Sequence, residues 1–473
     1  DLHSFPTRRS SDLKDLTYDS RNASEDKLFV CKGVYFKPEY FRSAIEAGTR
    51  WYMSETIYES DASYIIVNDI RKALSCVSAM YFGYDKDEID MTAFVGTKGK
   101  TSSVYFLLSI LEKAGKKTAY TTTVNNFDGN EVVEGFLTTP ESYELHSIIK
   151  RAVENGCSDM VMEVSSMAMK MQRIHSITYK YGAFLNISPD HISKFEHKDF
   201  DEYFYYKREI LRHVENLAVC IDDGHSQVII DQEGASRNIG TFSAGDTSAD
   251  ICFRDVVKEG LRRRIEVHTP EYDIRMLIPV AGDYNVSNAC CAVAVAYMMG
   301  IDKKDIVDGI ESAVIPGRME TLSYNGYTVI VDYAHNTVSM DSAMRNIRQD
   351  YPGMKIKALY GTSGGKVPQR RQDLAYSSGR SAVYCYLTMD NPNMDDPYQI
   401  DLEIQHFLDE LSCPSEIIVD RKQAIEKAIK ELERDEILLI TGKGAEHYQV
   451  IMGEHVPYEG DTFLADRFLK EYK

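Results

Sequence analysis

One short segment combines glycine, lysine and hydroxyl side chains in an order that suits the binding of phosphate. Residues 96–102 read Gly-Thr-Lys-Gly-Lys-Thr-Ser, and they lie between an apolar run at 91–95 and a helical pattern at 103–114. A glycine-rich turn between a strand and a helix directs backbone N–H groups and the positive helix N-terminus at phosphate oxygens. There Lys100 would reach the β- and γ-phosphates of a nucleotide, and the Thr101 hydroxyl would bind Mg²⁺. The two glycines are closer together than in the common G-x-x-x-x-G-K-[ST] loop, so an ordinary glycine-rich turn is the alternative.

Three further side chains have types suited to chemistry beside such a loop. Glu163 lies in a buried-looking strand at 160–164, where a hard carboxylate oxygen can hold Mg²⁺ and an exposed strand-end carboxylate is the alternative. His191 follows another strand, and a lone histidine is more often structural than a metal ligand. Lys207 follows the aromatic residues 203–206, a setting that desolvates an amine and lowers its pKa. Without further context, a lysine on a helix surface is the simpler interpretation.

The composition excludes two broad classes of function. The chain has 473 residues with 54 basic and 73 acidic side chains, a formal charge of −19, so a basic face that grips nucleic acid is not expected. No run reaches the roughly 18 apolar residues of a membrane-spanning helix, so no membrane partner is expected. The nine cysteines include no C-x-x-C pair, which is typical of reduced thiols in a cytoplasmic protein.

Changes of pattern along the chain predict three domains. Residues 1–13 lack an initiator methionine and any strand or helix period, and we expect this segment to be non-native. Residues 14–90 have the pattern of a small mixed α/β domain. At 91–317 apolar β-runs alternate with helical patterns, and this alternation resumes at 318–473. The predicted fold class is therefore α/β, with a small mixed N-terminal domain, a central ATPase-type domain that carries the phosphate loop, and a C-terminal Rossmann-like domain.

Apolar runs and helical periods also predict where individual elements lie. In the N-terminal domain we expect strands at 27–31 and 64–67 and a helix at 41–48. In the central domain we expect strands at 91–95, 160–164, 183–186 and 217–221 and a long helix at 285–299. In the C-terminal domain we expect strands at 328–331, 356–360, 382–387, 416–419 and 437–440 and a helix at 421–432.

Motifs along most of the chain resemble, in order, those of the Mur ligase family. In the first half they are Asp19-Ser20-Arg21, the loop at 96–101, Thr138-Thr139-Pro140-Glu141, Glu163-Val164-Ser165-Ser166 and Asn186-Ile187-Ser188-Pro189-Asp190-His191. In the second half they are Gly317-Arg318-Met319-Glu320, Asp332-Tyr333-Ala334-His335-Asn336, Asp390-Asn391-Pro392 and Gly442-Lys443-Gly444-Ala445-Glu446. So many matches in one order favour homology over coincidence.

The resemblance implies an ATP-dependent ligase of peptidoglycan precursor synthesis. Such an enzyme joins an amino acid to a UDP-linked muramyl peptide, here the UDP-muramyl-dipeptide UDP-N-acetylmuramoyl-L-alanyl-D-glutamate. A substrate carboxylate attacks the γ-phosphate of ATP, and an amine then displaces phosphate from the acyl-phosphate. The implied cofactors are ATP and Mg²⁺, the implied partners are the UDP-muramyl-dipeptide and an amino acid, and we expect a cytoplasmic monomer.

The resemblance also implies roles for individual residues. The catalytic residues would be Lys100, Glu163, His191 and Lys207, and the metal ligands would be Thr101, Glu163, His191 and Lys207 as a carbamate. The ATP contacts would be Gly96, Thr97, Lys98, Gly99, Lys100, Thr101, Ser102, Asn285, Asn288, Arg318, Asp332 and His335. The UDP-muramyl-dipeptide contacts would be Ser20, Thr138, Thr139, Ser165 and Arg173. The contacts to the incoming amino acid would be Arg371, Asp390, Asn391, Asn393, Asp395, Asp396, Gly442 and Glu446.

One position bears on which amino acid is added. Family members that add meso-diaminopimelate carry arginine after Asp-Asn-Pro, and here that position is Asn393, which cannot pair with a second carboxylate. The acidic Asp395 and Asp396 that follow suit a distal ammonium. The sequence therefore predicts L-lysine, and ornithine and meso-diaminopimelate remain open.

Two alternatives of different kinds remain. Met167 and Met171 stand where the family usually has histidine and glutamine, so a catalytically silent paralogue that acts as a binding protein is one. A folylpolyglutamate synthetase-like ligase is the other. The N-terminal motif around Ser20 argues against the folate ligase, because folate ligases lack the UDP-binding domain.

Overall fold

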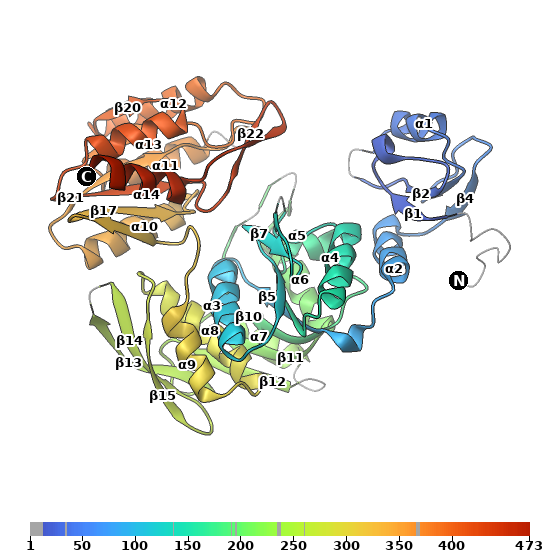
Figure 1. Ribbon diagram of the computed structural model, residues 1–473, viewed down its shortest axis with the longest axis horizontal. Coiled ribbons are helices and arrows are strands. Elements are labelled where there is room, and N and C mark those ends of the chain that lie inside the picture. The colour runs from blue at the N-terminus through green and yellow to red at the C-terminus, as the bar shows by residue number, and fades with distance from the viewer. Residues whose placement is uncertain are drawn as a thin grey trace.

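The computed structural model describes residues 13–33, 36–135, 137–190, 192–193, 196–233, 238–259, 261–365 and 369–473 (Figure 1). Three α/β units follow one another along the chain, each built on a sheet of its own. This arrangement confirms the predicted fold class. The segment 1–13 lies, apart from Leu13, outside the described residues, and His191 lies outside them too.

The N-terminal unit is a small parallel sheet in the order β1-β2-β3-β4. Its elements are β1 Asp15–Thr17, the 3-10 turn η2 Ser20–Asn22, β2 Lys27–Val30, α1 Pro38–Glu46, β3 Trp51–Ser54, β4 Ser63–Ile66 and α2 Ile70–Phe82. Helix α2 packs against α4 (Ser142–Glu154) of the central unit. The buried His146 of α4 bonds Tyr84 Oη, just after α2, at 2.8 Å and Ser176 Oγ at 2.9 Å.

The central unit has a sheet of 11 strands within the described residues, in the order β15-β14-β13-β12-β11-β10-β5-β9-β6-β7-β8. Its first strands are β5 Asp90–Val95, β6 Thr118–Thr121, β7 Asn125–Phe127, β8 Val132–Glu134, β9 Asp159–Glu163 and β10 Tyr179–Phe184. They are followed by β11 Val214–Cys220, β12 Asn238–Ser243, β13 Ile251–Glu259, β14 Arg262–His268 and β15 Asp273–Ile278. Its helices are η3 Lys86–Glu88, α3 Lys100–Lys113, α4, α5 Ser166–Lys170, α6 Phe200–Arg208, η4 Glu209–Arg212, α7 Ser226–Glu233, α8 Tyr284–Met298 and α9 Lys303–Ser312.

The expected parallel strands are present, but the extension β13–β15 was not predicted. Strand β14 runs antiparallel to both β13 and β15. Its buried Ile265 and Val267 alternate with Arg264 and Glu266, which are less buried. A period of two with one apolar face is the pattern of an antiparallel sheet that has one side in water. The sequence prediction named no element between residues 221 and 285, so it did not include these three strands.

The C-terminal unit has a sheet in the order β16-β17-β21-β18-β19-β20, in which only the edge pair β16-β17 is antiparallel within the described residues. Its strands are β16 Glu320–Tyr324, β17 Tyr327–Asp332, β18 Lys355–Tyr360, β19 Tyr384–Leu387, β20 Ser415–Ile417 and β21 Glu436–Thr441, and the hairpin β22 Tyr448–Ile451 and β23 Glu454–Pro457. Its helices are α10 Thr337–Asp350, α11 Gln369–Gly379, α12 Pro397–Glu410, α13 Arg421–Lys430 and α14 Asp461–Tyr472. The expected strands therefore all occur, with ends shifted by a few residues.

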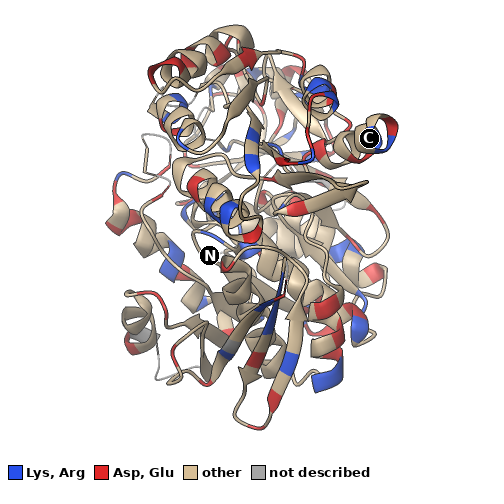
Figure 2. Cartoon of the chain, turned by 90° about the vertical axis from the view of Figure 1, so that its left-hand side faces the viewer, with Lys and Arg blue, Asp and Glu red and all other residues tan. Residues whose placement is uncertain are grey.

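Ion pairs connect the central and C-terminal units. The buried Arg263 of β14 pairs with Asp350, at the end of α10, at 2.8 Å, and Lys258 of β13 reaches the same carboxylate at 2.7 Å. In the view of Figure 2, blue basic and red acidic segments are interspersed along the backbone. Across the described ranges, no helix combines the length and apolar character needed to span a membrane.

The helix that follows the phosphate loop is held by close helix packing. Helix α3 packs against α8 and α9, and a Cβ added at Gly309 of α9 would lie 2.4 Å from Ile110 Cα of α3. A residue without a side chain at position 309 therefore allows α3 and α9 to pack this closely.

We expect Gly309→Ala to destabilise the protein, because the added methyl group meets backbone atoms that cannot move aside. Overpacking of this kind costs about 1–3 kcal/mol, which lowers the midpoint of thermal unfolding by several degrees in a unit of this size. Gly224→Ala is the control, since no atom lies within 4 Å of a Cβ added there. Equal midpoints for the two variants would contradict the packing argument.

Candidate active site

The phosphate loop connects β5 to α3, as the sequence predicts. Asn186, at the carboxyl end of β10, holds the loop, because its Oδ1 accepts from Thr97 N at 3.0 Å and from Lys98 N at 2.9 Å. Asn288 of α8 lies against the loop from the other side, and a Cβ at Gly99 would lie 2.2 Å from its Oδ1. Asn186 thus binds the loop directly and Asn288 packs against it, and no role was predicted for Asn186 although it belongs to a family motif.

Two lysine amines converge on one carbonyl of the loop. Lys100 Nζ donates to Gly96 O at 2.9 Å, and Lys207 Nζ donates to the same oxygen at 2.6 Å. Burial lowers the pKa of Lys100 and lowers that of Lys207 far more, and Lys100 adds to the effect on Lys207. The aromatic setting expected for Lys207 is present, since its amine lies 4.9 Å from the centre of the Tyr203 ring. A lowered pKa favours the neutral amine, and this effect is stronger for Lys207 than for Lys100.

A carboxylate and a hydroxyl meet on the other side of Lys100. Thr101 Oγ1 donates to Glu163 Oε1 at 2.8 Å, and Thr123 Oγ1 donates to Glu163 Oε2 at 3.2 Å. Glu163 is the buried last residue of β9. Such hard oxygen donors fit Mg²⁺, which binds one or two protein oxygens and completes its shell with water and phosphate oxygens. Thr101 and Glu163 are therefore the described residues that fit the predicted metal role.

The predicted UDP-muramyl-dipeptide residues of the central unit adjoin Glu163. Thr139 Oγ1 donates to Glu163 O at 2.9 Å and accepts from Ser165 N at 3.1 Å. The Thr138 hydroxyl accepts from Thr123 Oγ1 at 3.2 Å. These hydroxyls thus line the chain next to the carboxylate that fits the metal.

A shared carboxylate links this region to the N-terminal unit. Arg173 Nε donates to Glu141 Oε1 at 2.9 Å, and Lys32 pairs with the other oxygen of Glu141. Lys32 follows β2, in the same unit as Ser20, which begins η2. A role was predicted for Arg173 but not for Lys32 or Glu141, although Glu141 is the last residue of the motif at 138–141.

The joint between the central and C-terminal units brings Arg318 to the phosphate loop. Arg318 Nη2 donates to Thr101 Oγ1 at 3.4 Å, and its guanidinium lies 4.4 Å from the centre of the Tyr333 ring. Beside it, Gly317 has φ 61°, and a Cβ there would lie 2.3 Å from Ala445 N. The joint therefore contacts both the phosphate loop and the loop that follows β21.

Three more predicted ATP contacts are Asn285 in α8, and Asp332 and His335 at and just after the end of β17. Asp332 accepts from Met319 N and Ala334 N, each at 2.8 Å, and burial raises its pKa. Burial lowers the pKa of His335 to about 4, so this imidazole is neutral at pH 7. Asn285 is fully buried, and its amide donates to Ala281 O at 2.7 Å.

A second polar cluster lies at the carboxyl edge of the C-terminal sheet. Lys443 Nζ donates to Asn391 Oδ1 at 2.9 Å and pairs with Glu446, and Tyr333 Oη donates to Glu446 at 2.8 Å. Asp390 is buried, and burial raises its pKa to about 6 although Lys443 and Arg421 oppose the shift. Lys443 is fully buried and was quoted in a motif without a role.

Other predicted amino-acid contacts are engaged with the protein itself. Asn393 has φ 54°, and its amide donates to Gly364 O at 3.0 Å and to Asn391 O at 3.1 Å. Arg371 pairs with Asp395 at 3.2 Å, and Asp396 caps α12. These side chains shape the loop after β19, and their contact with the amino acid stays a prediction.

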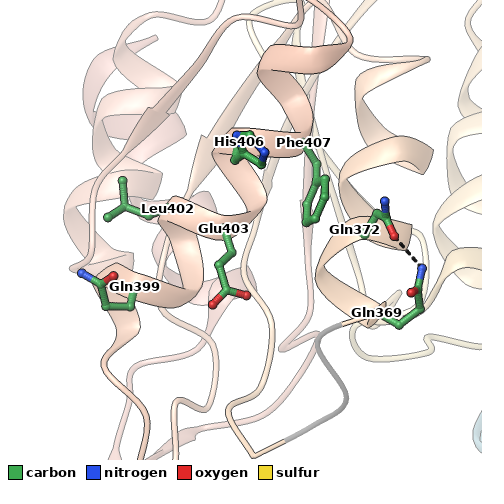
Figure 3. A pocket seen from close by; sticks show the side chains of 7 residues that line it. All are labelled: Gln369, Gln372, Gln399, Leu402, Glu403, His406 and Phe407. Carbon is green, nitrogen blue, oxygen red and sulfur yellow. Dashed lines mark hydrogen bonds between the residues drawn. The ribbon is translucent and has the colours of Figure 1, made fainter.

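A surface pocket of about 480 Å³ (Figure 3) adjoins Arg371, because Glu403 in its lining pairs with that arginine at 2.6 Å. It is formed by side chains of α11 and α12, namely Gln369, Gln372, Gln399, Leu402, Glu403, His406 and Phe407. It contains none of the residues predicted from the sequence.

The geometry defines a class of protein, in which a phosphate-loop α/β unit and a C-terminal α/β unit meet at an arginine that reaches the loop. Comparison with known families agrees, since the Mur ligase middle domain matches residues 95–296 and the Mur ligase, glutamate ligase domain matches residues 317–444. The chain belongs to the Mur ligase family, as the motifs predicted.

Named relatives match almost the whole chain. The UDP-N-acetylmuramoyl-L-alanyl-D-glutamate–L-lysine ligase of Streptococcus pneumoniae is 35% identical over 457 residues, which cover 96% of this chain and 92% of that protein. The ligase of the same name from Enterococcus faecalis is 36% identical over 471 residues, covering 96% and 91%. A solved UDP-N-acetylmuramoyl-L-alanyl-D-glutamate–2,6-diaminopimelate ligase has a similar fold, with a TM-score of 0.68 at 21% identity over 97% of this chain and 95% of that chain.

The raised pKa of Asp390 predicts a stability cost. A carboxyl whose pKa is raised from 3.8 to about 6 on folding makes the folded state less stable as pH rises through that window, and the loss persists above it. Asp390→Asn carries no charge, so we expect its thermal unfolding midpoint to exceed that of the wild type at about pH 7.5 but not near pH 4. Asp409→Asn, at an exposed aspartate of α12, is the control and should show no such difference. A midpoint for Asp390→Asn at or below the wild type at both pH values would contradict the assignment.

Proposed function

We propose that the protein is an ATP-dependent ligase that adds L-lysine to UDP-N-acetylmuramoyl-L-alanyl-D-glutamate through an acyl-phosphate. The observation that carries the proposal is the contact of Arg318 with Thr101, which joins the phosphate loop to the unit that holds the Asp390 and Glu446 cluster. The likeness to the two L-lysine ligases over 96% of the chain supports the choice of reaction and of amino acid.

We further propose how the work is divided along the chain. Residues 14–90 bind the UDP portion of the substrate, residues 91–317 bind ATP, and residues 318–473 bind the incoming amino acid. The ligase acts as a monomer in the cytoplasm. This division follows the positions of Ser20, the phosphate loop and Glu446 in the three units.

The positive charges of Lys100 and Arg318 suit the transfer of a phosphoryl group, the first of the two chemical steps. In the first step a carboxylate oxygen of the muramyl-dipeptide attacks the γ-phosphorus of ATP, and ADP leaves. Lys100 neutralises the phosphoryl oxygens and Arg318 approaches from the joint, because charge on the transferred group must be balanced by fixed cations. In the second step the amine attacks the carbonyl carbon, loses a proton, and inorganic phosphate leaves. Thr101 and Glu163 would hold Mg²⁺, which would add to the neutralisation of phosphate charge.

The C-terminal cluster suits an amino acid with an ammonium group at its far end. Asp390 and Glu446 provide negative charge, and Asn393 provides no cation for a second carboxylate because its amide is bonded to backbone oxygens. The charge balance therefore favours L-lysine over meso-diaminopimelate. Ornithine has the same terminal charge as lysine and is the nearest competing substrate.

We expect release of ADP that requires both the muramyl-dipeptide and lysine, with a higher kcat/KM for lysine than for meso-diaminopimelate. One missing charge-assisted pair is worth about 1.5–3 kcal/mol, or roughly ten- to a hundredfold in selectivity. Asn393→Arg should narrow this gap by offering the second carboxylate a cation. Asn393→Gly is the matched control, since glycine accepts the positive φ at this position without adding charge.

The outcomes of this assay separate the alternatives. Preference of the wild type for meso-diaminopimelate would contradict the specificity argument. An absence of amine-dependent ADP release would favour the silent paralogue, and dependence on a folate would favour the folate ligase. Lys100→Ala should lose the activity while it keeps its fold, because it removes the cation that faces the transferred phosphate.

We expect Lys207→Ala to lose nearly all turnover, and short carboxylic acids such as acetate to restore part of it. The reason is that Lys207, as a carbamate, would supply an anion beside Mg²⁺ that a small carboxylate can replace. Turnover is measured with and without acetate, and Lys180→Ala is the control because Lys180 is half-exposed and pairs with Asp90. Full activity of Lys207→Ala, or rescue by a small amine instead, would overturn the carbamate.

A further inference from the structure

The C-terminal unit contains a fully buried ion pair between two helix starts. Arg421 begins α13 and Asp461 begins α14, and both side chains have 0% exposure. The guanidinium binds the carboxylate through two parallel hydrogen bonds, Nε to Oδ1 at 2.8 Å and Nη2 to Oδ2 at 2.7 Å. Tyr458 Oη also donates to Asp461 Oδ1, at 2.7 Å.

The same guanidinium holds the end of β21. Arg421 Nη2 donates to Thr441 O at 2.8 Å, and Thr441 is the last residue of that strand. The next residue, Gly442, lies between two charged groups, since a Cβ there would be 3.1 Å from Asp390 Oδ2 and 4.0 Å from Arg421 Nη2. Lys443 and Glu446 follow directly, so Arg421 lies beneath the segment 441–446 that carries the polar cluster.

Stability alone is a poor reason for a charge pair in this place. Removing two charges from water costs several kcal/mol per ion, and apolar residues of similar volume often stabilise a core as well or better. The pair does something that apolar residues cannot do: it donates to the Thr441 carbonyl while its second partner fixes the plane of the guanidinium. The guanidinium thereby fixes the position of the Thr441 carbonyl, at the start of segment 441–446.

We propose that Arg421 and Asp461 are positioning residues for the amino-acid site, which hold segment 441–446 so that Lys443, Glu446 and Asp390 keep their places around the incoming amine. This inference rests on the proposed function for the identity of the amine. Neither residue contacts the reacting atoms. Their effect reaches the amino acid through Thr441 and Gly442.

The test compares Arg421→Lys and the isosteric Asp461→Asn with a control ion pair in the same sheet. Lysine keeps the charge of Arg421 but cannot bind both Asp461 and Thr441 O in the same geometry. The control is Lys357→Met, which removes a pair of 2.7 Å between Lys357 of β18 and Glu436 at the start of β21, with exposures of 12% and 7%. Each of the three variants weakens or removes an ion pair that has little exposure. Only Arg421→Lys and Asp461→Asn change the pair that holds segment 441–446.

In Arg421→Lys and Asp461→Asn we expect KM for the amino acid to rise about tenfold or more, the size of one lost charge-assisted hydrogen bond. KM for ATP and the rate of acyl-phosphate formation without amine should stay within about twofold of the wild type. Lys357→Met should lower thermal stability without raising KM for the amino acid. An unchanged KM in a folded Arg421 or Asp461 variant, or an equal rise in Lys357→Met, would overturn the proposal.

Amide hydrogen exchange gives a readout that does not depend on the reaction. Protection of residues 442–446 should fall in the Arg421 and Asp461 variants and stay at the wild-type level in Lys357→Met. Loss of protection in a protein with no lysine-dependent turnover would refute the proposed substrate but keep the positioning role. Unchanged protection in both variants would refute the positioning role whatever the substrate is.

Discussion

Two lysine amines donate to one backbone carbonyl, that of Gly96, and the phosphate loop is organised around this shared acceptor. Lys207 has an exposed fraction of only 2%, and both burial and the neighbouring Lys100 lower its pKa. The lowered pKa favours the neutral amine of Lys207, which is the form that the proposed carbamylation requires. The surrounding structure keeps the amines in place: Asn186 binds the loop, and α8 and α9 pack around the helix that begins at Lys100.

In the C-terminal unit, burial and a neighbouring like charge raise the pKa of a carboxylate, that of Asp390. Asp390 is buried near Glu446, and these carboxylates repel each other. Lys443 and Arg421 offset part of that repulsion, but the pKa of Asp390 still rises to about 6. Sites that bind charged ligands commonly accept such a loss of stability, since a charge that is fully satisfied within the protein offers little to a ligand. The joint at Gly317 and Arg318 therefore contacts both the phosphate loop, which is proposed to bind ATP, and the loop after β21, whose Glu446 is proposed to bind the incoming amino acid.

Sequence patterns predicted the parts of this architecture that depend on local order. The strand-turn-helix at Lys100 and the strand that ends at Glu163 could be predicted because residue type and spacing determine them. The antiparallel strands β13–β15 were missed because their period of two was overlooked. Lys443, Lys32 and Arg421 could not be assigned from order alone, since their partners lie far away in the chain and are brought together only by tertiary packing. Asn393 was predicted to contact the incoming amino acid, and the structure shows in addition that its amide donates to the Gly364 carbonyl.

The contact of Gly317 with Ala445 has a consequence for the exchange of parts between related enzymes. An added Cβ at Gly317 would lie 2.3 Å from Ala445 N and 2.6 Å from Gly444 C, so the joint and the loop after β21 are shaped to fit each other. Arg318, the next residue, reaches the phosphate loop. A chimaera that imports a foreign C-terminal unit to change the amino acid should therefore take its crossover before Pro316, so that the glycine travels with the loop it touches. A crossover after Arg318 would combine the native joint with a foreign loop after β21. The two would then no longer fit each other, and the segment that carries Glu446 would be displaced.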